Sequence, residues 1–203
     1  MKIEIASVDS VILYFDETIS EEVLDLVQDA FYRLKNLPYI INLTPSYHSI
    51  LIQYDISKYD TVSIVQAIKE IIEDTALFTH KAHGKYIEIP VDYSKGLDLE
   101  RIAKLHNITT KQVIAIHTEK AYRVYAIGFM VGFAYLASVD DAIATPRLST
   151  PRSKVPKGSV AIAESQTAIY PQESAGGWNI IGHTDFDDYA SFEIGDNVRF
   201  IAI

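Results

Sequence analysis

Cysteine is absent from this 203-residue chain. Its absence excludes disulfides, thiolate catalysis and cysteine-bound metal, and it fits a protein of a reducing compartment. No apolar run approaches the roughly 18 to 20 residues that a membrane-spanning helix needs, so no membrane partner is expected. The first ten residues carry polar groups without a small-residue cleavage pattern, which argues against a signal peptide. We therefore expect a cytoplasmic protein.

Positive charge is also scarce. The 18 lysines and arginines are outnumbered by 27 acidic residues, which gives a formal net charge of −9. Nucleic acids bind concentrated positive patches, so a nucleic-acid partner is not expected. Two short helices predicted around residues 106–108 allow a helix-turn-helix interpretation. The second helix offers only Lys111 as an exposed base reader, so this interpretation is not favoured.

Several motifs with known chemistry are missing. The chain has no GxxxxGK[ST] loop for nucleotide phosphates and no GxSxG nucleophile elbow. His80 and His83 have HxxH spacing, but they lack an obvious third ligand, and no metal site is predicted. Any nucleotide that the protein uses is therefore expected to bind mainly on a partner.

Residues 1–82 predict a small α+β domain. Branched and aromatic residues at 11–15 predict a buried strand, and Thr18 or Ser20 can cap the helix that follows. The other elements expected here are strands at 39–43 and 49–54 and a helix at 60–72. The order strand, helix, two strands, helix, strand is typical of helices on one face of an antiparallel sheet.

Residues 83–203 predict a mainly β domain, and the polar segment 78–85 is the expected linker. A strand at 86–91 and short helices at 98–105 and 109–116 are followed by strands separated by turns. These strands are expected at residues 122–126, 159–163, 168–170, 178–182 and 197–203. Several short strands at regular spacing favour a closed barrel, which leaves no exposed edges.

The stretch from Gly128 to Trp178 is the candidate site. It is dense in residues that reduce stability unless their positions demand them, namely Gly128, Gly132, Gly158, Gly176, Gly177, Pro146, Pro151, Pro156 and Pro171. Rigid loops that carry aromatic and charged groups are a usual way to present a site. The alternative is a set of turns in a β-rich domain with ordinary surface charges.

Motifs along this stretch and before it resemble a known family. They are PSYHSILIQYD at 45–55, IGF at 127–129, GF at 132–133, YL at 135–136, ATPR at 144–147, TPR at 150–152, VP at 155–156, GSVAI at 158–162, QT at 166–167, IYP at 169–171 and GGW at 176–178. Together they resemble the KipI/allophanate-hydrolase-subunit-1 family, whose members are also described as the B subunit of 5-oxoprolinase. The resemblance covers nearly the full chain.

The resemblance implies an N-terminal α+β domain followed by a cyclophilin-like β-barrel. It also implies a role beside the A and C subunits of 5-oxoprolinase in ATP-dependent opening of 5-oxoproline to glutamate, with no activity of the chain alone. ATP with Mg²⁺ is then expected mainly on these partner subunits. One relative suggests an alternative, an inhibitor that binds a sensor histidine kinase and blocks its autophosphorylation.

The chain departs from the family pattern at three prolines. Val131, Ala134 and Ala175 stand where family members usually have proline. Fewer prolines leave the unfolded chain freer, and the loops less rigid, without altering the fold.

Lactam opening needs groups that hold a carboxylate or a phosphate. Arg147 and Arg152 suit this task, because guanidinium forks bind such anions in a bidentate way. The alternative is that both arginines form surface salt bridges with Asp140, Asp141 or Glu173.

Other candidates for substrate binding are polar or aromatic. Gln166 and Tyr170 can donate and accept hydrogen bonds in a pocket. Gly176 and Gly177 can place backbone N–H groups against an anion, although hairpin turns use paired glycines as often. An apolar wall, or equally an ordinary core, is expected from Phe129, Phe133, Tyr135 and Trp178.

Glu173 and His117 are the candidates for catalytic proton transfer. The alternatives are that Glu173 is a solvated loop carboxylate and that His117 closes the C-terminus of a helix.

Overall fold

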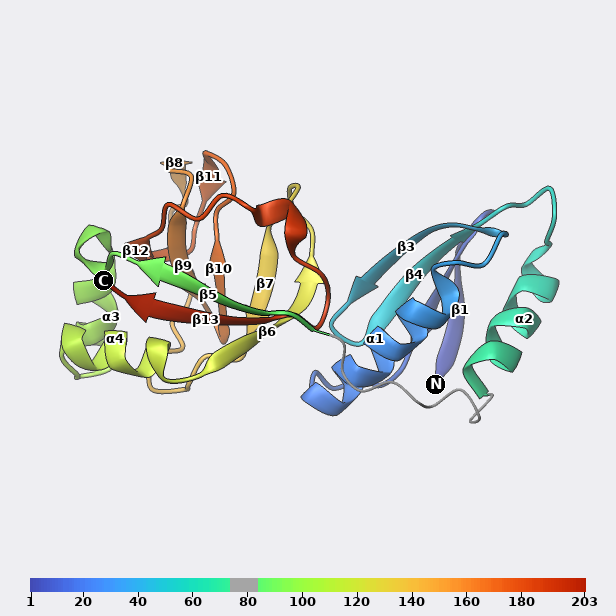
Figure 1. Ribbon diagram of the computed structural model, residues 1–203, viewed down its shortest axis with the longest axis horizontal. Coiled ribbons are helices and arrows are strands. Elements are labelled where there is room, and N and C mark those ends of the chain that lie inside the picture. The colour runs from blue at the N-terminus through green and yellow to red at the C-terminus, as the bar shows by residue number, and fades with distance from the viewer. Residues whose placement is uncertain (74–83) are drawn as a thin grey trace. The chain divides into compact units, whose positions relative to one another are not determined.

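The computed structural model describes residues 1–73 and 84–203 and divides the chain into two compact units, Met1–His83 and Gly84–Ile203 (Figure 1). The predicted boundary at 82–83, most of the predicted linker, and both His80 and His83 lie outside the described residues. The last strand predicted for the first domain falls in the same segment.

The first unit is a four-stranded antiparallel sheet covered on one face by two helices (Figure 1). Its elements are β1 (Lys2–Ser7), β2 (Ser10–Tyr14), α1 (Glu21–Leu34), β3 (Ile40–Ser46), β4 (Ser49–Tyr54) and α2 (Thr61–Glu73), with sheet order β1-β2-β4-β3. Val11 lies opposite Ile52 and Leu13 opposite Ile50, and all four are buried. Alternate residues of a strand share a face, so this pattern defines the side that the helices cover.

Ser20, and not Thr18, caps α1. Its hydroxyl accepts a hydrogen bond from the backbone N–H of Val23 at 3.2 Å. The sequence pattern did not predict β1, because Ile3 and Ile5 are its only branched residues and Ile5 is 69% exposed. The strand forms because it pairs along β2, a long-range interaction that local propensity does not encode.

The second unit is a nearly closed, barrel-shaped mixed sheet, and the chain as a whole has an α+β fold. The sheet contains β12 (Asn179–His183), β9 (Ser159–Ala163), β10 (Gln166–Ile169), β7 (Ala134–Ala137), β6 (Ala121–Ile127), β13 (Asn197–Ala202) and β5 (Tyr86–Val91), in that order. β5 pairs with β13 in parallel. The two edges meet at a bridge in which Asp92 N–H donates to the His183 carbonyl at 2.8 Å.

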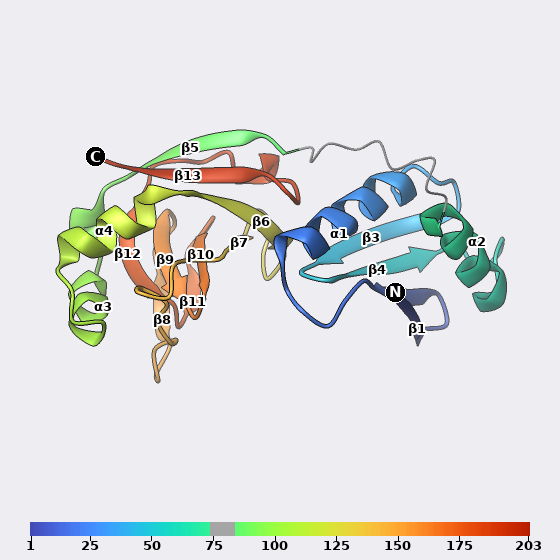
Figure 2. The same cartoon turned by 90° about the horizontal axis from the view of Figure 1, so that it is seen from below.

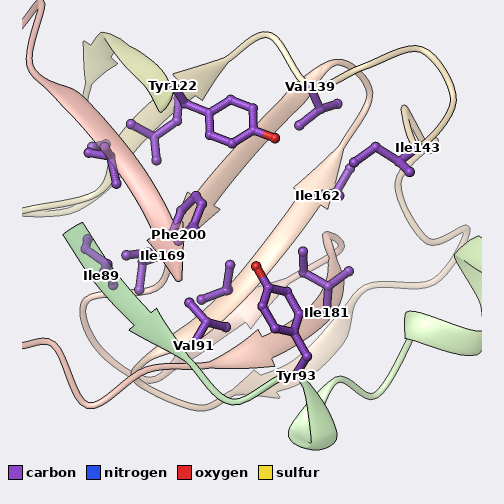
Figure 3. Close-up of a cluster of buried hydrophobic side chains, with 14 of the residues drawn as sticks. Ile89, Val91, Tyr93, Tyr122, Val139, Ile143, Ile162, Ile169, Ile181 and Phe200 are labelled. Carbon is purple, nitrogen blue, oxygen red and sulfur yellow. The ribbon is translucent and has the colours of Figure 1, made fainter. Parts of the chain in front are cut away.

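The barrel encloses a core of aliphatic and aromatic side chains. Figure 3 shows the rings of Tyr93 and Tyr122 among residues such as Val91 and Ile162. A second, smaller cluster contains Phe133, Val155, Ala161, Ala163, Ala168, Tyr170, Trp178 and Ile180. A short ribbon of β8 (Arg152–Val155) and β11 (Ser174–Gly176) supplies the loops next to this second cluster.

Helices α3 (Leu99–Leu105) and α4 (Thr110–Glu119) lie together at one end of the barrel unit (Figure 2). Thr109 and Gln112 form a capping box at the start of α4. The buried residues Ile102 and Val113 show that the apolar faces of both helices pack inward. Two 3-10 turns, Tyr93–Lys95 and Tyr189–Ser191, complete the unit. None of the helices in the described ranges is long and apolar enough to cross a membrane.

Candidate functional site

A pocket of about 230 Å³ is walled by part of the smaller core cluster. It lies in the stretch that the sequence singles out. Eight of the ten residues predicted to bind substrate line it, namely Phe129, Phe133, Tyr135, Arg147, Tyr170, Gly176, Gly177 and Trp178. Pro151 and Ala175, which the sequence analysis did not propose, line it as well. The structure therefore gathers most of the predicted site in one hollow.

Phe133 is the centre of the aromatic wall. Its ring centroid lies 4.9 Å from that of Tyr135, 5.4 Å from Tyr170 and 5.6 Å from Trp178. These contacts are edge-on, the arrangement that aromatic quadrupoles prefer. Phe133 and Trp178 are also buried core residues. The two interpretations of these aromatics, wall and core, therefore both hold.

Phe129 stands at the rim of the pocket. Its φ is +70°, a left-handed backbone conformation that bulky residues rarely adopt, and its side chain is 63% exposed. The ring meets Phe133 edge-on at 5.4 Å. A strained residue that leaves an aromatic ring exposed is more typical of a ligand-contact position than of a structural one.

Arg147 supplies the positive charge of the pocket. The residue is exposed, and its guanidinium carbon lies 5.8 Å from the centroid of the Trp178 ring. Burial raises the pKa of Tyr135 and of Tyr170, and nearby Arg147 opposes both shifts. Both hydroxyls therefore stay protonated at neutral pH and can donate hydrogen bonds to an anion.

Arg152 does not line the pocket. One of its terminal nitrogens, Nη2, donates to Asp98 Oδ1 at 2.7 Å, and Asp98 Oδ2 accepts from the backbone N–H of Ile180 at 2.7 Å. This pair was not among the salt bridges that the sequence suggested. The other terminal nitrogen, Nη1, is buried without a hydrogen-bond partner among the described residues. In this geometry Arg152 fixes the loop, while Arg147 faces the pocket.

Gln166 and the two predicted acid–base residues are also outside the pocket lining. Gln166 begins β10, where it is half-buried. Glu173 is an exposed loop residue that pairs with Lys154 at 3.0 Å. His117 is fully buried, with Nδ1 2.7 Å from Tyr93 Oη and Nε2 2.9 Å from Thr167 Oγ1. This geometry gives no support to His117 as a proton-transfer group in the pocket.

Gly176 leaves the space that the Tyr170 hydroxyl occupies. A Cβ atom at position 176 would lie 2.3 Å from Tyr170 Oη. We expect Gly176→Ala to displace the Tyr170 ring and to lower the free energy of unfolding by about 1–3 kcal/mol, the usual cost of overpacking. Urea unfolding measures this change.

Gly177→Ala is the matched control for Gly176→Ala. A Cβ atom at position 177 has its nearest contact at 3.6 Å, with Pro151, which is ordinary van der Waals distance. Equal losses of stability in the two variants would contradict the proposed role of Gly176.

A larger hollow of about 670 Å³ lies in the first unit, and it is lined by Met1, Lys2, Glu4, Tyr14, Phe15, Asp16, Glu17, Thr18 and His48. Three of its charged side chains already have local partners. Lys2 pairs with Glu4, and Asp16 Oδ1 accepts from the backbone N–H groups of Glu17 and Thr18. The smaller pocket is the better candidate site, because a guanidinium and two tyrosines surround one space.

Comparison with known proteins places this architecture in a family. The family described as carboxyltransferase domain, subdomain C and D, matches residues 1–193, and the chain belongs to it. The chain is similar to proteins named as the B subunit of 5-oxoprolinase, and the resemblance inferred from the sequence motifs is thereby confirmed. The family assignment does not by itself assign roles to single residues.

Two such relatives differ in how much of the chain they match. The protein of Bacillus subtilis is 33% identical over 96% of this chain and 89% of its own length. That of Haemophilus influenzae is 46% identical over 58% of this chain and 60% of its own length.

The crystal structure of TTHA0988 has a TM-score of 0.81 and 32% identity. It matches 97% of this chain, which covers only 40% of the TTHA0988 chain.

Proposed function

We propose that the chain is the B-type component of a cytoplasmic, multi-subunit 5-oxoprolinase that opens 5-oxoproline to glutamate at the expense of ATP. The names of the relatives support a 5-oxoprolinase-type system, and a protein named as one of its subunits implies partner chains. We take these partners to be the A and C subunits of the same enzyme. The chain alone is then expected to be inactive.

The observation that carries the proposal is the chemistry of the pocket. The substrate is a small lactam ring that carries one carboxylate. The pocket, at about 230 Å³, is smaller than the roughly 300–1,000 Å³ typical of drug-sized ligands. Arg147 offers a guanidinium fork for the carboxylate, and Phe133 and Trp178 offer apolar walls for the ring. Tyr135 and Tyr170 line the pocket and stay protonated, so their hydroxyls can donate hydrogen bonds to the remaining oxygens.

The same pocket does not fit Mg²⁺-ATP. Among the described lining residues Arg147 is the single cation, and none is a carboxylate that could bind the metal. A triphosphate usually needs several donors, so one guanidinium at an aromatic pocket is a poor match. We therefore assign ATP and Mg²⁺ mainly to the partner subunits.

Within this scheme the chain binds and orients the lactam. The described lining residues include no histidine and no carboxylate, so a general base for water comes from a partner protein or from outside the pocket. Glu173 remains a prediction for that role. Glu173→Gln in the assembled enzyme tests it, because a catalytic carboxylate would be lost while the shape of the side chain is kept.

Reconstitution tests the proposed function. The purified chain is mixed with the A and C subunits from the same source, and glutamate release is followed with 5-oxoproline and Mg²⁺-ATP. We expect turnover with all three proteins and none when this chain is omitted. Failure of the complete mixture to release glutamate would refute the proposal. Reduced autophosphorylation of a sensor histidine kinase, without lactam turnover, would instead favour the inhibitor alternative.

A further inference from the structure

Three consecutive residues, 177–179, hold the loop that carries Arg147. They contact loop residues 148, 147 and 146 in that order. The Gly177 carbonyl accepts from the Leu148 N–H at 2.7 Å. The Trp178 ring centroid lies 5.8 Å from the Arg147 guanidinium carbon. Asn179 Nδ2 donates to the Pro146 carbonyl at 3.0 Å. Residues 177–179 thus contact residues 148–146 one by one, and the peptide on each side of Arg147 is held.

Asn179 is a buried amide whose hydrogen-bonding groups all have assigned partners. Its two N–H groups donate to the carbonyls of Pro146 and Ile162, each at 3.0 Å. Its oxygen accepts a hydrogen bond from Arg101 Nη1 on α3. Because Arg101 can only donate, it fixes which end of the amide faces the loop. Asn179 is 0% exposed, so solvent water does not compete for the hydrogen bonds that fix its orientation.

The other end of the loop has a separate anchor. The Arg152–Asp98 pair ties the first residue of β8 to the backbone of Ile180 in β12. Between the two anchors, Arg147 is exposed and carries no salt bridge among the described contacts. A long, flexible cation gains specificity when its backbone is already placed, because less freedom is lost on binding.

We propose that Asn179 is the positioning residue for Arg147, and that Arg101 holds Asn179 in the orientation this requires. Asn179 touches neither the space of the pocket nor a ligand in it. It acts through the Pro146 carbonyl, one peptide from the arginine. The identity of the ligand rests on the proposed function, whereas the contacts that hold the loop do not.

Two variants separate the parts of this arrangement. Asn179→Asp keeps the shape and the acceptor toward Arg101 but removes both donors. Arg101→Met leaves the donors but frees the amide to rotate, and it changes a residue that is itself exposed. Asn42→Asp, at an exposed position of β3 in the first unit, is the control for an asparagine-to-aspartate change as such.

Hydrogen exchange tests the positioning without any ligand. The Leu148 amide should exchange about tenfold faster in Asn179→Asp, and faster to a smaller extent in Arg101→Met, because the loop opens locally. Exchange in β6 and β13 should stay as in the unmodified protein. Wild-type exchange at Leu148 in both variants would overturn the proposal. An equal rise throughout the barrel would also overturn it, since Asn179 would then be an ordinary core residue.

Ligand binding tests the link to Arg147 through a double-mutant cycle. Trp178 is the single tryptophan of the chain, so its fluorescence reports on the pocket alone. We expect Asn179→Asp to raise the Kd for 5-oxoproline about tenfold in the natural background and to leave it unchanged in an Arg147→Ala background. Additive effects would overturn the proposal. If the unmodified chain does not respond to 5-oxoproline, the proposed ligand fails and the exchange result alone decides the positioning.

Discussion

Replacing Arg147 by alanine should raise the KM for 5-oxoproline of the reconstituted enzyme by about 10- to 100-fold. Charge-assisted hydrogen bonds contribute about 1.5–3 kcal/mol, and each 1.4 kcal/mol is tenfold in affinity. Arg147 is the cation that lines the described pocket, where its guanidinium carbon lies 5.8 Å from the Trp178 ring centroid. If the arginine binds the ground state and the transition state equally, kcat should change little. Steady-state kinetics at saturating ATP measure both quantities.

Two further variants are the controls for Arg147→Ala. Arg147→Lys keeps the charge but loses the bidentate fork, so its KM should lie between those of the unmodified enzyme and Arg147→Ala. Lys111→Ala removes an exposed cation of α4 that does not line the pocket, and it should leave KM unchanged. A KM for Arg147→Ala within twofold of the unmodified value would show that the carboxylate binds elsewhere.

Local sequence patterns predicted the elements whose residues have their own preference for strand or helix. The strands expected at 49–54, 86–91 and 159–163 coincide with β4, β5 and β9. The helices could be predicted because their N-cap contacts and the spacing of their apolar residues involve neighbours within about one helical turn. β7, β8 and β11 were not predicted, because each has three or four residues in Gly- and Pro-containing sequence and depends on a distant partner.

The candidate site follows the same division. Glycines, prolines and aromatics marked the stretch that lines the pocket, because these residues are used where a backbone or a ring must approach closely. The sequence could not distinguish Arg147 from Arg152, since the partner of Arg152 is Asp98, 54 residues earlier. Asp98 begins the helix expected at 98–105, yet its carboxylate accepts hydrogen bonds from Arg152 and from the Ile180 N–H and does not cap the helix. The sequence around Asn179 did not mark it as a functional residue. Its role arises only where β12, β9 and the loop that carries Arg147 come together.

Lowering the pH below 6.5 should destabilise the protein through His117. Thr167 Oγ1 donates its proton to the Ala161 carbonyl, so His117 Nε2 must donate to Thr167 and Nδ1 must accept from the Tyr93 hydroxyl. A second ring proton, on Nδ1, would face the Tyr93 hydroxyl proton, and Tyr93 would have to turn that proton elsewhere. Burial lowers the pKa of His117 to about 3, against an ordinary value of 6.5. The ring stays neutral in the folded state, while the unfolded chain takes up a proton as the pH falls through 6.5.

The direction and size of the effect follow from proton linkage. The stability that depends on neutral His117 is complete above pH 6.5 and decreases as the pH falls toward 3, by about 1.4 kcal/mol per pH unit. At pH 4.5 this residue alone should cost about 2–3 kcal/mol. Carboxylates also titrate in this range, so the measurement is a comparison between variants. Urea unfolding from pH 7 to 4.5 gives the slope for each protein.

His117→Gln should flatten that slope by about 1 kcal/mol per pH unit, because glutamine does not titrate. Its stability at pH 7 should be lower than that of the unmodified protein, since the stacking of the ring on Phe200, with centroids 4.6 Å apart, is lost. His106→Gln is the matched control at a half-buried position that follows α3. Parallel slopes for His117→Gln and the unmodified protein would mean that His117 takes up its proton in the folded state. A buried ring with both nitrogens already hydrogen-bonded could do so only by rearranging Tyr93 and Thr167, and the core of the barrel would then be less fixed than these contacts require.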